Sequence, residues 1–320
     1  MNVYDRYELP PDKADLHRRA VRLEWWTIVF FVCAVALLAV TLGQSQAMKA
    51  AWIEDMLGLV PPIAFLIADR YRNRAPDRRL PYGYHRTVNV AFLAGSIALL
   101  GLGAYVVYDS LVRLLSGERA PIGLVELLGV QLWLGWLMIA VLVATMVPAI
   151  LLGRAKIKIA RELHDKVLYA DAEMNRADWL TAGAAVAGVL GIGLGLWWAD
   201  AVAALVIGAD IVRDGVRTTR AAVANLMDSR PQVVDGTAEH PLPARLLAAV
   251  LDQDWVADAW LRVREEGHVF VGELLVVPSR DDGLVERLEA LGVWARDFDW
   301  RIHDLVVAPV SHIDPAPADR

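Results

Sequence analysis

Long apolar runs separated by short polar segments dominate the first two thirds of the chain. Each run is close to the roughly 20 residues that an α-helix needs to cross a ~30 Å hydrocarbon layer. The pattern therefore predicts an all-α bundle of six transmembrane spans. The runs cover residues 25–43, 51–68, 88–115, 127–152, 169–198 and 199–216.

Three local features should shape this bundle. Pro61 and Pro62 lie near the middle of the second run, and proline removes helix hydrogen bonds, so we expect a kink there. Between the third and fourth runs, residues 116–126 have the composition of a turn-rich loop. Only residues 198–200 can turn between the last two runs, which predicts a tight antiparallel hairpin.

A different pattern begins after residue 228. Apolar positions have helical spacing in residues 243–253 and 282–291, whereas they alternate in residues 256–264, 268–278 and 300–309, with a turn at 265–267. The resulting α-β-β-α-β order predicts a small α+β domain of the ferredoxin-like or metallochaperone-like kind. Two helices should cover one face of a three-stranded sheet.

These patterns divide the chain into five segments. We expect a polar N-terminal segment, a six-helix transmembrane domain, a linker, the α+β domain, and a tail rich in alanine, proline and aspartate that is disordered. Their bounds are residues 1–24, 25–228, 229–242, 243–310 and 311–320, in that order.

Lysine and arginine are distributed unevenly between the predicted loops. They concentrate before the first run, between the second and third runs, and between the fourth and fifth runs, whereas the intervening loops contain few. The positive-inside rule therefore places both termini in the cytoplasm. We expect a multi-pass protein of the cytoplasmic (inner) membrane, surrounded by membrane lipid.

The composition narrows the range of functions. Hydrophobic residues make up 56% of the 320 positions, which is too apolar for an ordinary soluble domain of this length. The net charge of −6 and the short basic blocks give no sign of a nucleic-acid surface. Cys33 is the only cysteine, which excludes an intrachain disulfide and a cysteine-based zinc cluster. No nucleophile and base are clustered, so we do not expect an enzyme.

The polar stretch at residues 164–180, HDKVLYADAEMNRADWL, runs without a break into an apolar segment. Asp171, Met174, Asn175 and Asp178 stand at i, i+3, i+4 and i+7, so they share one face of a helix. An ionisable residue that enters the apolar part of a span is costly and usually marks an ion or substrate path. Asp178 is therefore the first candidate functional residue.

Several motifs together resemble the cation diffusion facilitator family of divalent-metal transporters. They are PYGYHR before the third run, ADAEMNRADWLTA at the start of the fifth, WWADAVAALVIGADIVRDGVRTTRAAVANLMD through the sixth, and the α-β-β-α-β tail. The resemblance covers most of the chain, and its most specific part is the pair formed by the fifth and sixth runs.

The resemblance implies a metal site between the second and fifth spans. Family members usually carry two aspartates four residues apart on the second span, and a histidine or aspartate four residues before an aspartate on the fifth. In this chain Glu54 and Gly58 match the first pair of positions, and Met174 and Asp178 match the second. Asp55 is a possible substitute for the missing second-span ligand. The candidate metal ligands are Glu54, Asp55, Asp178, Asn175, Met174 and Asp171, an atypical set.

Each candidate also has a structural alternative. Glu54 and Asp55 could be acids at a helix start, favoured by the helix dipole, and Asp171 could cap the fifth helix. Met174 could simply fill a gap in the core. Asp178 could pair with a basic neighbour, Arg176.

The function implied by the resemblance is export of a divalent metal from the cytoplasm, with zinc, manganese or iron as the substrate and no organic cofactor. Carboxylates bind metal when deprotonated and release it when protonated, so exchange for protons is the expected coupling. We also expect a homodimer, in which an uncovered sheet face with Val269, Val271 and Leu274 contributes to the contact. The alternative is a family member that does not transport and acts as a membrane-anchored dimeric scaffold or metal sensor.

Overall fold

The computed structural model describes residues 9–72, 78–80, 86–118, 121–127, 129–267 and 269–314. The PYGYHR motif at residues 81–86 lies almost entirely outside this part of the chain, as do residues 315–320 of the expected disordered tail. The first seven helices are α1 (Pro11–Thr41), α2 (Gln46–Leu57), α3 (Val60–Arg72), α4 (Thr87–Ser116), α5 (Leu134–Leu163), α6 (Lys166–Gly193) and α7 (Ala199–Leu226).

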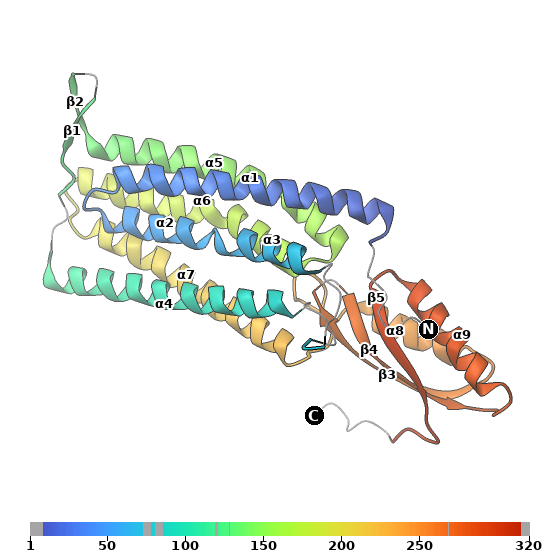
Figure 1. Cartoon of the computed structure of the whole chain (residues 1–320). Helices are drawn as coiled ribbons and strands as arrows, with labels where there is room; N and C mark the ends of the chain where they lie inside the picture. Colours follow the sequence, from blue (N-terminus) through green and yellow to red (C-terminus); the bar gives the residue numbers. More distant parts are fainter. Residues whose placement is uncertain are drawn as a thin grey trace.

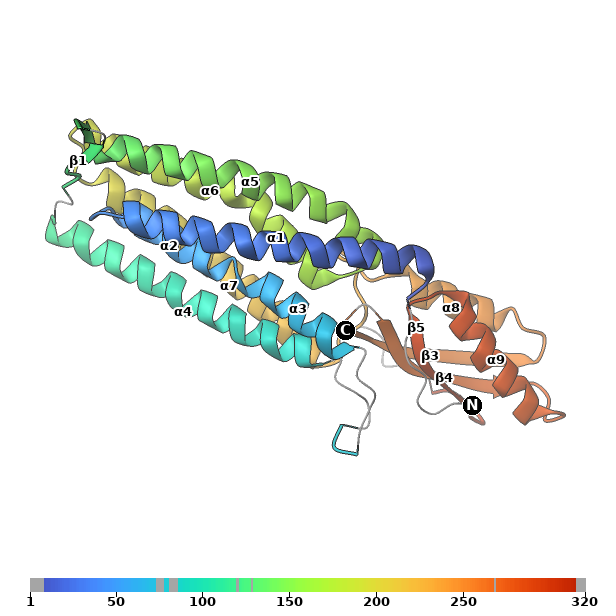
Figure 2. The same ribbon diagram turned by 45° about the horizontal axis from the view of Figure 1, so that its top comes forward.

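These helices lie side by side in one elongated bundle, and the C-terminal residues form a separate unit at one end of it (Figures 1 and 2). In the bundle α1 packs on α5, α5 on α6, α6 on α7, and α7 on α4. Gly215 of α7 faces the backbone of Leu100 on α4, where an added Cβ would meet the Leu100 Cα at 2.9 Å. Helices α4 and α7 can approach this closely only because a side chain is missing.

Four helical segments in the described part of the chain are long and apolar enough to cross a membrane. They are Pro11–Thr41, Gln46–Tyr71, Phe92–Ser116 and Leu134–Leu163. Helices α6 and α7, of 28 residues each, lie beside these four in the same bundle. The apolar part of the chain is therefore a helical membrane region.

The second apolar run is two helices rather than one bent helix. Helix α2 ends at Leu57, Gly58 caps it, and α3 begins at Val60. Pro61 and Pro62 lie in the first turn of α3, where a proline costs little because its missing N–H would have no helical partner. The predicted kink is confirmed, and it is a complete break just before the two prolines.

Two predicted boundaries around the fourth and fifth runs are wrong. Strands β1 (Leu124–Leu127) and β2 (Val130–Trp133) form an antiparallel hairpin where a loop and the start of a helix were expected. Helix α5 then continues to Leu163, through basic residues that were assigned to a loop. This extension is helical because its buried positions keep a helical spacing and its basic side chains alternate with them.

The turn between the last two helices of the bundle also differs from the prediction. Helix α6 ends at Gly193, and residues 194–198 form the turn, with Gly195 at φ +85°. Asp200 therefore lies inside α7 rather than in the turn. The tight antiparallel hairpin itself is confirmed, since α6 and α7 pack against each other.

The C-terminal unit contains α8 (Pro241–Leu251), β3 (Val256–Glu266), β4 (Val269–Pro278), α9 (Leu284–Phe298) and β5 (Ile302–Pro309). The strand order is β3-β4-β5, with β3 antiparallel and β5 parallel to β4. The predicted α-β-β-α-β order is confirmed, and the unit is an α+β domain with a three-stranded mixed sheet.

The core of this unit lies between the sheet and its two helices, where Leu246, Phe270, Leu274 and Leu291 pack together. Leu274 is fully buried there, so its expected place on the open sheet face is wrong. Side chains alternate along a strand, and Val271 points to the face opposite Leu274. The register puts Trp260, Leu275 and Val306 on the same open face as Val271.

Two further acids were misplaced in the sequence interpretation. Glu265 and Glu266 belong to the last residues of β3, not to a turn, and both are buried. Glu265 accepts a hydrogen bond from the Lys166 ammonium at the start of α6, with an Nζ–Oε2 distance of 2.7 Å. This ion pair joins the membrane helices to the α+β domain, and the adjoining end of the bundle is called the junction end below.

Candidate functional site

Three of the predicted ligands line one small cleft inside the bundle. Glu54 and Asp55 come from α2, and Asp178 comes from α6. The cleft has a volume of about 20 Å³, and its other walls are largely apolar side chains such as Phe31 and Leu142. A cavity needs roughly 10–15 Å³ to hold a water molecule, so this one has room for a single water or a single bare ion.

The break between α2 and α3 places the C-terminal end of a helix, with its two acids, at the cleft. Glu54 and Asp55 lie in the last turn of α2, directly before the break at Gly58. They are therefore not acids at a helix start, because Ser45 caps that end of α2. A helix C-terminus carries partial negative charge, and such ends of interrupted membrane helices are suited to coordinate cations.

The carboxylates of the cleft have few polar partners. Thr181 Oγ1 donates to Glu54 Oε1 at 2.9 Å, which links α6 to α2 beside Asp178. None of the three acids forms an ion pair with a described side chain. In the described part of the chain, no group of three or more His, Cys, Asp or Glu side chains is placed so that it could hold a metal ion. The cleft is thus rich in carboxyl groups that have few polar partners.

Asp171 and Asn175 lie outside this cleft, in a second polar cluster. Lys156 of α5 donates to Glu24 Oε2 of α1 at 3.0 Å and contacts Asp171 Oδ2 of α6. Asn175 Nδ2 donates to Asp171 Oδ2 at 3.3 Å. Asp171 does not cap α6, since Asp165 accepts from the N–H groups that begin the helix. Met174 is half-buried and is absent from the lining of the cleft.

Glu24 and Lys156 were missed by the sequence analysis. Glu24 was placed in the polar N-terminal segment, and Lys156 was counted as a loop residue of the basic side. Their side chains are 0% exposed. The available signal was the helical spacing of buried positions in α5, in which Gly153, Lys156 and Ala160 follow one another on one face.

Asp200 and Asp210, on the sixth apolar run, have different roles. The Asp200 carboxylate accepts from Ser45 Oγ at 2.6 Å and from the backbone N–H groups of Gln46 and Ala47 at 2.5 and 3.2 Å. It therefore caps α2 rather than its own helix. Asp210 lies 3.7 Å from Arg213, outside both clusters.

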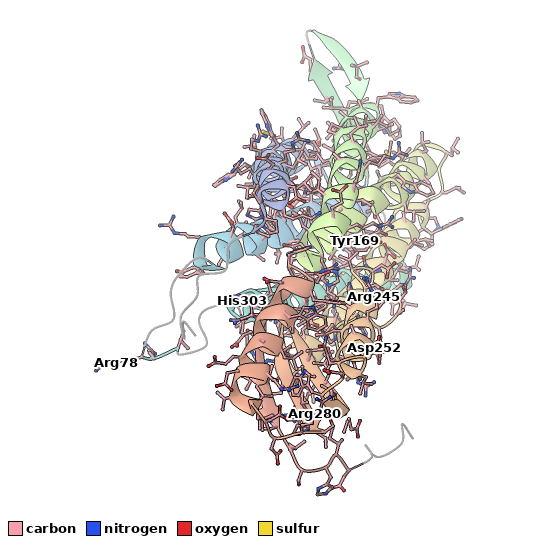
Figure 3. All side chains as sticks on the ribbon, turned by 90° about the vertical axis from the view of Figure 1, so that its right-hand side faces the viewer. Arg78, Tyr169, Arg245, Asp252, Arg280 and His303 are labelled. Atoms are coloured by element: carbon pink, nitrogen blue, oxygen red, sulfur yellow. The ribbon has the colours of Figure 1, made fainter. Side chains whose placement is uncertain are left out.

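A larger cavity of about 440 Å³ lies at the junction end. Tyr169, labelled in Figure 3, is part of its wall and lies where the helices meet the α+β domain. More acids than basic residues line it: Asp165, Glu173, Asp235, Glu265 and Glu266 against Lys166 and Arg217. The cavity lies beside the first two turns of α6, on the way from the junction end to Asp171.

Two histidines contribute to the same junction. The rings of His164 and His240 lie 4.9 Å apart, and Phe270 packs against both. Burial lowers the pKa of His240 to about 4, and the charges of His164 and Arg301 act in the same direction. Both ring nitrogens of His240 face N–H donors, from Leu242 and Arg301, so a protonated ring would meet donors on both sides.

Comparison with known proteins identifies the membrane region. Residues 25–227 match the family model described as the cation efflux transmembrane domain, which covers more than half of the chain. The chain belongs to the cation efflux family. It is accordingly a multi-pass integral membrane protein of a transporter family and not an enzyme.

Similar proteins include the magnetosome protein MamB of Magnetospirillum gryphiswaldense, 24% identical over 208 residues, which are 64% of this chain and 66% of MamB. The manganese efflux system protein MneS of Bacillus subtilis is 23% identical over 175 residues, 55% of this chain and 56% of MneS. A cadmium, cobalt and zinc/H(+)-K(+) antiporter of the same organism is 23% identical over 185 residues, 57% of this chain and 54% of the antiporter. The match spans just under two thirds of the length of MamB and just over half of the length of the other two relatives.

Proposed function

We propose that this protein exports a divalent metal cation, and that Glu54, Asp55 and Asp178 hold the ion during transport. The observation that carries the proposal is the cleft in which these three acids meet, with room for one ion and no described cationic partner. Several carboxylates held together among apolar helices repel one another unless a cation or protons balance them. A cargo cation supplies that balance.

The oxygen-rich set suits hard to intermediate cations such as Mn²⁺ and Fe²⁺. Zn²⁺ favours imidazole nitrogen and thiolate sulfur in addition to carboxylates, and the described lining of the cleft contains no histidine or cysteine, its one sulfur being the thioether of Met146. A manganese efflux protein among the relatives agrees with this preference. Mn²⁺ is therefore the first metal to test, with Fe²⁺ and Zn²⁺ beside it.

Exchange for protons is the proposed coupling. Metal binding requires deprotonated carboxylates, so protonation from the far side of the membrane would release the ion. One relative is named as an antiporter that uses H⁺. The transport domain is proposed to have six spans, α1 and α4 to α7 with α2 and α3 sharing one, over residues 25–228. Residues 229–242 would then link it to the α+β domain at residues 243–310.

Both termini are proposed to lie in the cytoplasm of a cytoplasmic (inner) membrane protein, because the basic residues concentrate on that side. Accessibility of single cysteines checks this in a background that lacks Cys33. A cysteine at position 118 should react with an impermeant thiol reagent in intact cells, and one at Ser279 should react only after lysis. Labelling of position 279 in intact cells would reverse the orientation.

A homodimer is the proposed assembly. The open sheet face presents Trp260, Leu275 and Val306, with Val306 50% exposed, and these residues replace Leu274 in the expected contact. A cysteine at Val306 should form crosslinked dimers in native membranes. If crosslinking traps only monomers at every protein density, the dimer is excluded.

Transport by purified protein in proteoliposomes tests the main proposal. With an imposed pH gradient, the wild type should move Mn²⁺, and Asp178→Ala should lower the initial rate at least about a hundredfold, because a direct ligand is lost. Asp210→Ala is the matched control, since Asp210 lies on α7 outside the cleft. If Asp178→Ala transports every divalent metal at the wild-type rate, the site is misplaced and a scaffold or sensor is the better function.

A further inference from the structure

We propose that Glu24, Asp171 and Asn175 form a second cation-binding position, and that the Lys156 ammonium occupies it as a built-in competitor of the cargo. The inference rests on the proposed transport function but concerns residues outside the Glu54–Asp178 cleft. The Lys156 ammonium is then a tethered cation, and a divalent ion that moves along α6 displaces it from the two acids.

The chemistry of the cluster is that of a cation site. Two carboxylates contact a single ammonium group, and the Asn175 amide joins them through its hydrogen bond to Asp171. The side chains of Glu24 and Lys156 are 0% exposed, with Asp171 at 1%. With both acids deprotonated, the single charge of Lys156 leaves the cluster with one negative charge in excess. A fully buried excess of this kind attracts a further cation.

Two oxygen atoms of the cluster have no donor. Glu24 Oε1 and Asn175 Oδ1 are buried and make no hydrogen bond to any described group. Asn175 lies in the cluster because its amide nitrogen donates to Asp171 Oδ2. Buried acceptors without donors are costly, and a multivalent cation could contact several of them where one ammonium group reaches only two. The cluster therefore contains more oxygen atoms that could bind a cation than the two that Lys156 contacts.

The position of the cluster supports a place on the ion path. Asp171 and Asp178 are seven residues apart on one face of α6, roughly 10 Å along the helix axis. Asp171 is the nearer of the two to the acidic cavity at the junction end, whose wall includes Tyr169 and Glu173. An ion that enters from that cavity and follows α6 meets the Lys156 cluster before it meets the Glu54–Asp178 cleft.

Removal of the tethered cation should expose the site to metal. In detergent, at a Mn²⁺ concentration that fills the Glu54–Asp178 cleft but does not displace Lys156 in the wild type, purified Lys156→Met should bind one more Mn²⁺ per chain than the wild type. Electron paramagnetic resonance of free Mn²⁺ gives the count, and Mn²⁺ should raise the thermal midpoint of the variant. The extra ion should be absent from Lys156→Met/Asp171→Asn. Lys158→Met is the matched control, because Lys158 lies on the same helix with its side chain 86% exposed. An unchanged Mn²⁺ count in folded Lys156→Met would overturn the proposal.

A second measurement uses the wild-type chain and does not depend on the folding of a variant. Reductive methylation followed by peptide mass spectrometry reports the reactivity of Lys156, with Lys158 as the internal reference. Saturating Mn²⁺ should raise the modification rate of Lys156 roughly tenfold, in the range of ordinary coupling between binding events. Equal rates with and without Mn²⁺ would contradict displacement of the lysine.

The failure of this inference can be separated from that of the transport function. In an Asp178→Asn background, the Glu54–Asp178 cleft loses a ligand while the second cluster is intact. Lys156→Met/Asp178→Asn should still gain one Mn²⁺ relative to Asp178→Asn alone. If that gain is found and Asp178→Ala transports normally, the second cluster is real and the proposed transport site is wrong.

Discussion

Two acid clusters lie on the same face of α6, and they balance their charge in opposite ways. Around Asp171, two carboxylates enclose the Lys156 ammonium, and the side chains are shielded from solvent. Around Asp178, the acids Glu54 and Asp55 line a small cleft and have no described cationic partner. One cluster carries its cation as part of the chain, whereas the other is proposed to take its cation from solution.

This difference separates stability from function. Breaking a buried ion pair leaves an uncompensated charge and destabilises the fold strongly. Removing an acid that has no partner relieves repulsion instead, and such sites cost stability in return for activity. Mutation of the Lys156 cluster should therefore lower stability more than transport, whereas mutation of the Glu54–Asp178 cleft should lower transport more than stability.

The largest expected effect on stability comes from Lys156. Without added divalent metal, Lys156→Met should lose about 3 kcal/mol of unfolding free energy, because Glu24 and Asp171 are left buried without their cation. Denaturant unfolding in detergent measures this, and Lys158→Met should change the free energy by less than about 0.5 kcal/mol. Equal stability of the two variants would mean that the ion pair contributes nothing to the fold.

Asp200 extends the comparison to an acid that is balanced by N–H and O–H donors alone. Asp200→Ala should lose about 2 kcal/mol of unfolding free energy, since it removes a buried cap from the start of α2. Asp200→Asn should recover part of the loss because its amide oxygen can still accept one of these hydrogen bonds. If alanine and asparagine give the wild-type midpoint, the cap is unimportant and Asp200 must be explained in another way.

Asp178 should show the reverse behaviour. Asp178→Asn is expected to keep or raise the unfolding free energy, by up to about 1 kcal/mol, because it removes repulsion from Glu54 and Asp55. The same unfolding assay in metal-free buffer measures this. A loss as large as that of Lys156→Met would make the cleft a structural cluster and remove the contrast between the two sites.

The smallest expected effect on stability comes from His240, whose surroundings disfavour the protonated, positively charged ring. Its folded pKa of about 4 lies below the ~6.5 of an unfolded histidine, so the unfolded chain binds more protons between these values. Its contribution to stability is complete above pH 6.5 and is lost as the pH falls toward 4. Thermal unfolding of the full chain should show this slope. His240→Asn should flatten it, since asparagine keeps the cap on α8 without titrating. An identical slope in the variant would assign the pH dependence to other groups.

The sequence predicted the features that depend on hydrophobic pattern. The apolar runs, a kink near Pro61 and the α-β-β-α-β order follow directly from spacing and composition. The ends of helices were less predictable, because the last turns of α5 are amphipathic and basic and resemble a loop when charge alone is counted. The hairpin of β1 and β2 was missed because its apolar residues could equally begin a helix.

The candidate site was predictable only within a single helix. The spacing along α6 placed Asp171, Asn175 and Asp178 on one face, but it could not show that they belong to two clusters. That division depends on Lys156 of α5, which contacts Glu24 of α1 and Asp171 of α6. Lys156 is 132 residues from Glu24 and 15 residues from Asp171 in the sequence. Such contacts between distant segments have no signature in one sequence.

Equilibrium binding of Mn²⁺ to the purified protein tests the central claim most directly, namely that the cleft acids, which have no described cationic partner, bind the cargo. The wild type should bind one tightly held Mn²⁺ per chain, Asp178→Asn should lose it, and Asp210→Asn should keep it. Retention of the tightly bound ion by Asp178→Asn, or its absence from the wild type, would contradict the account.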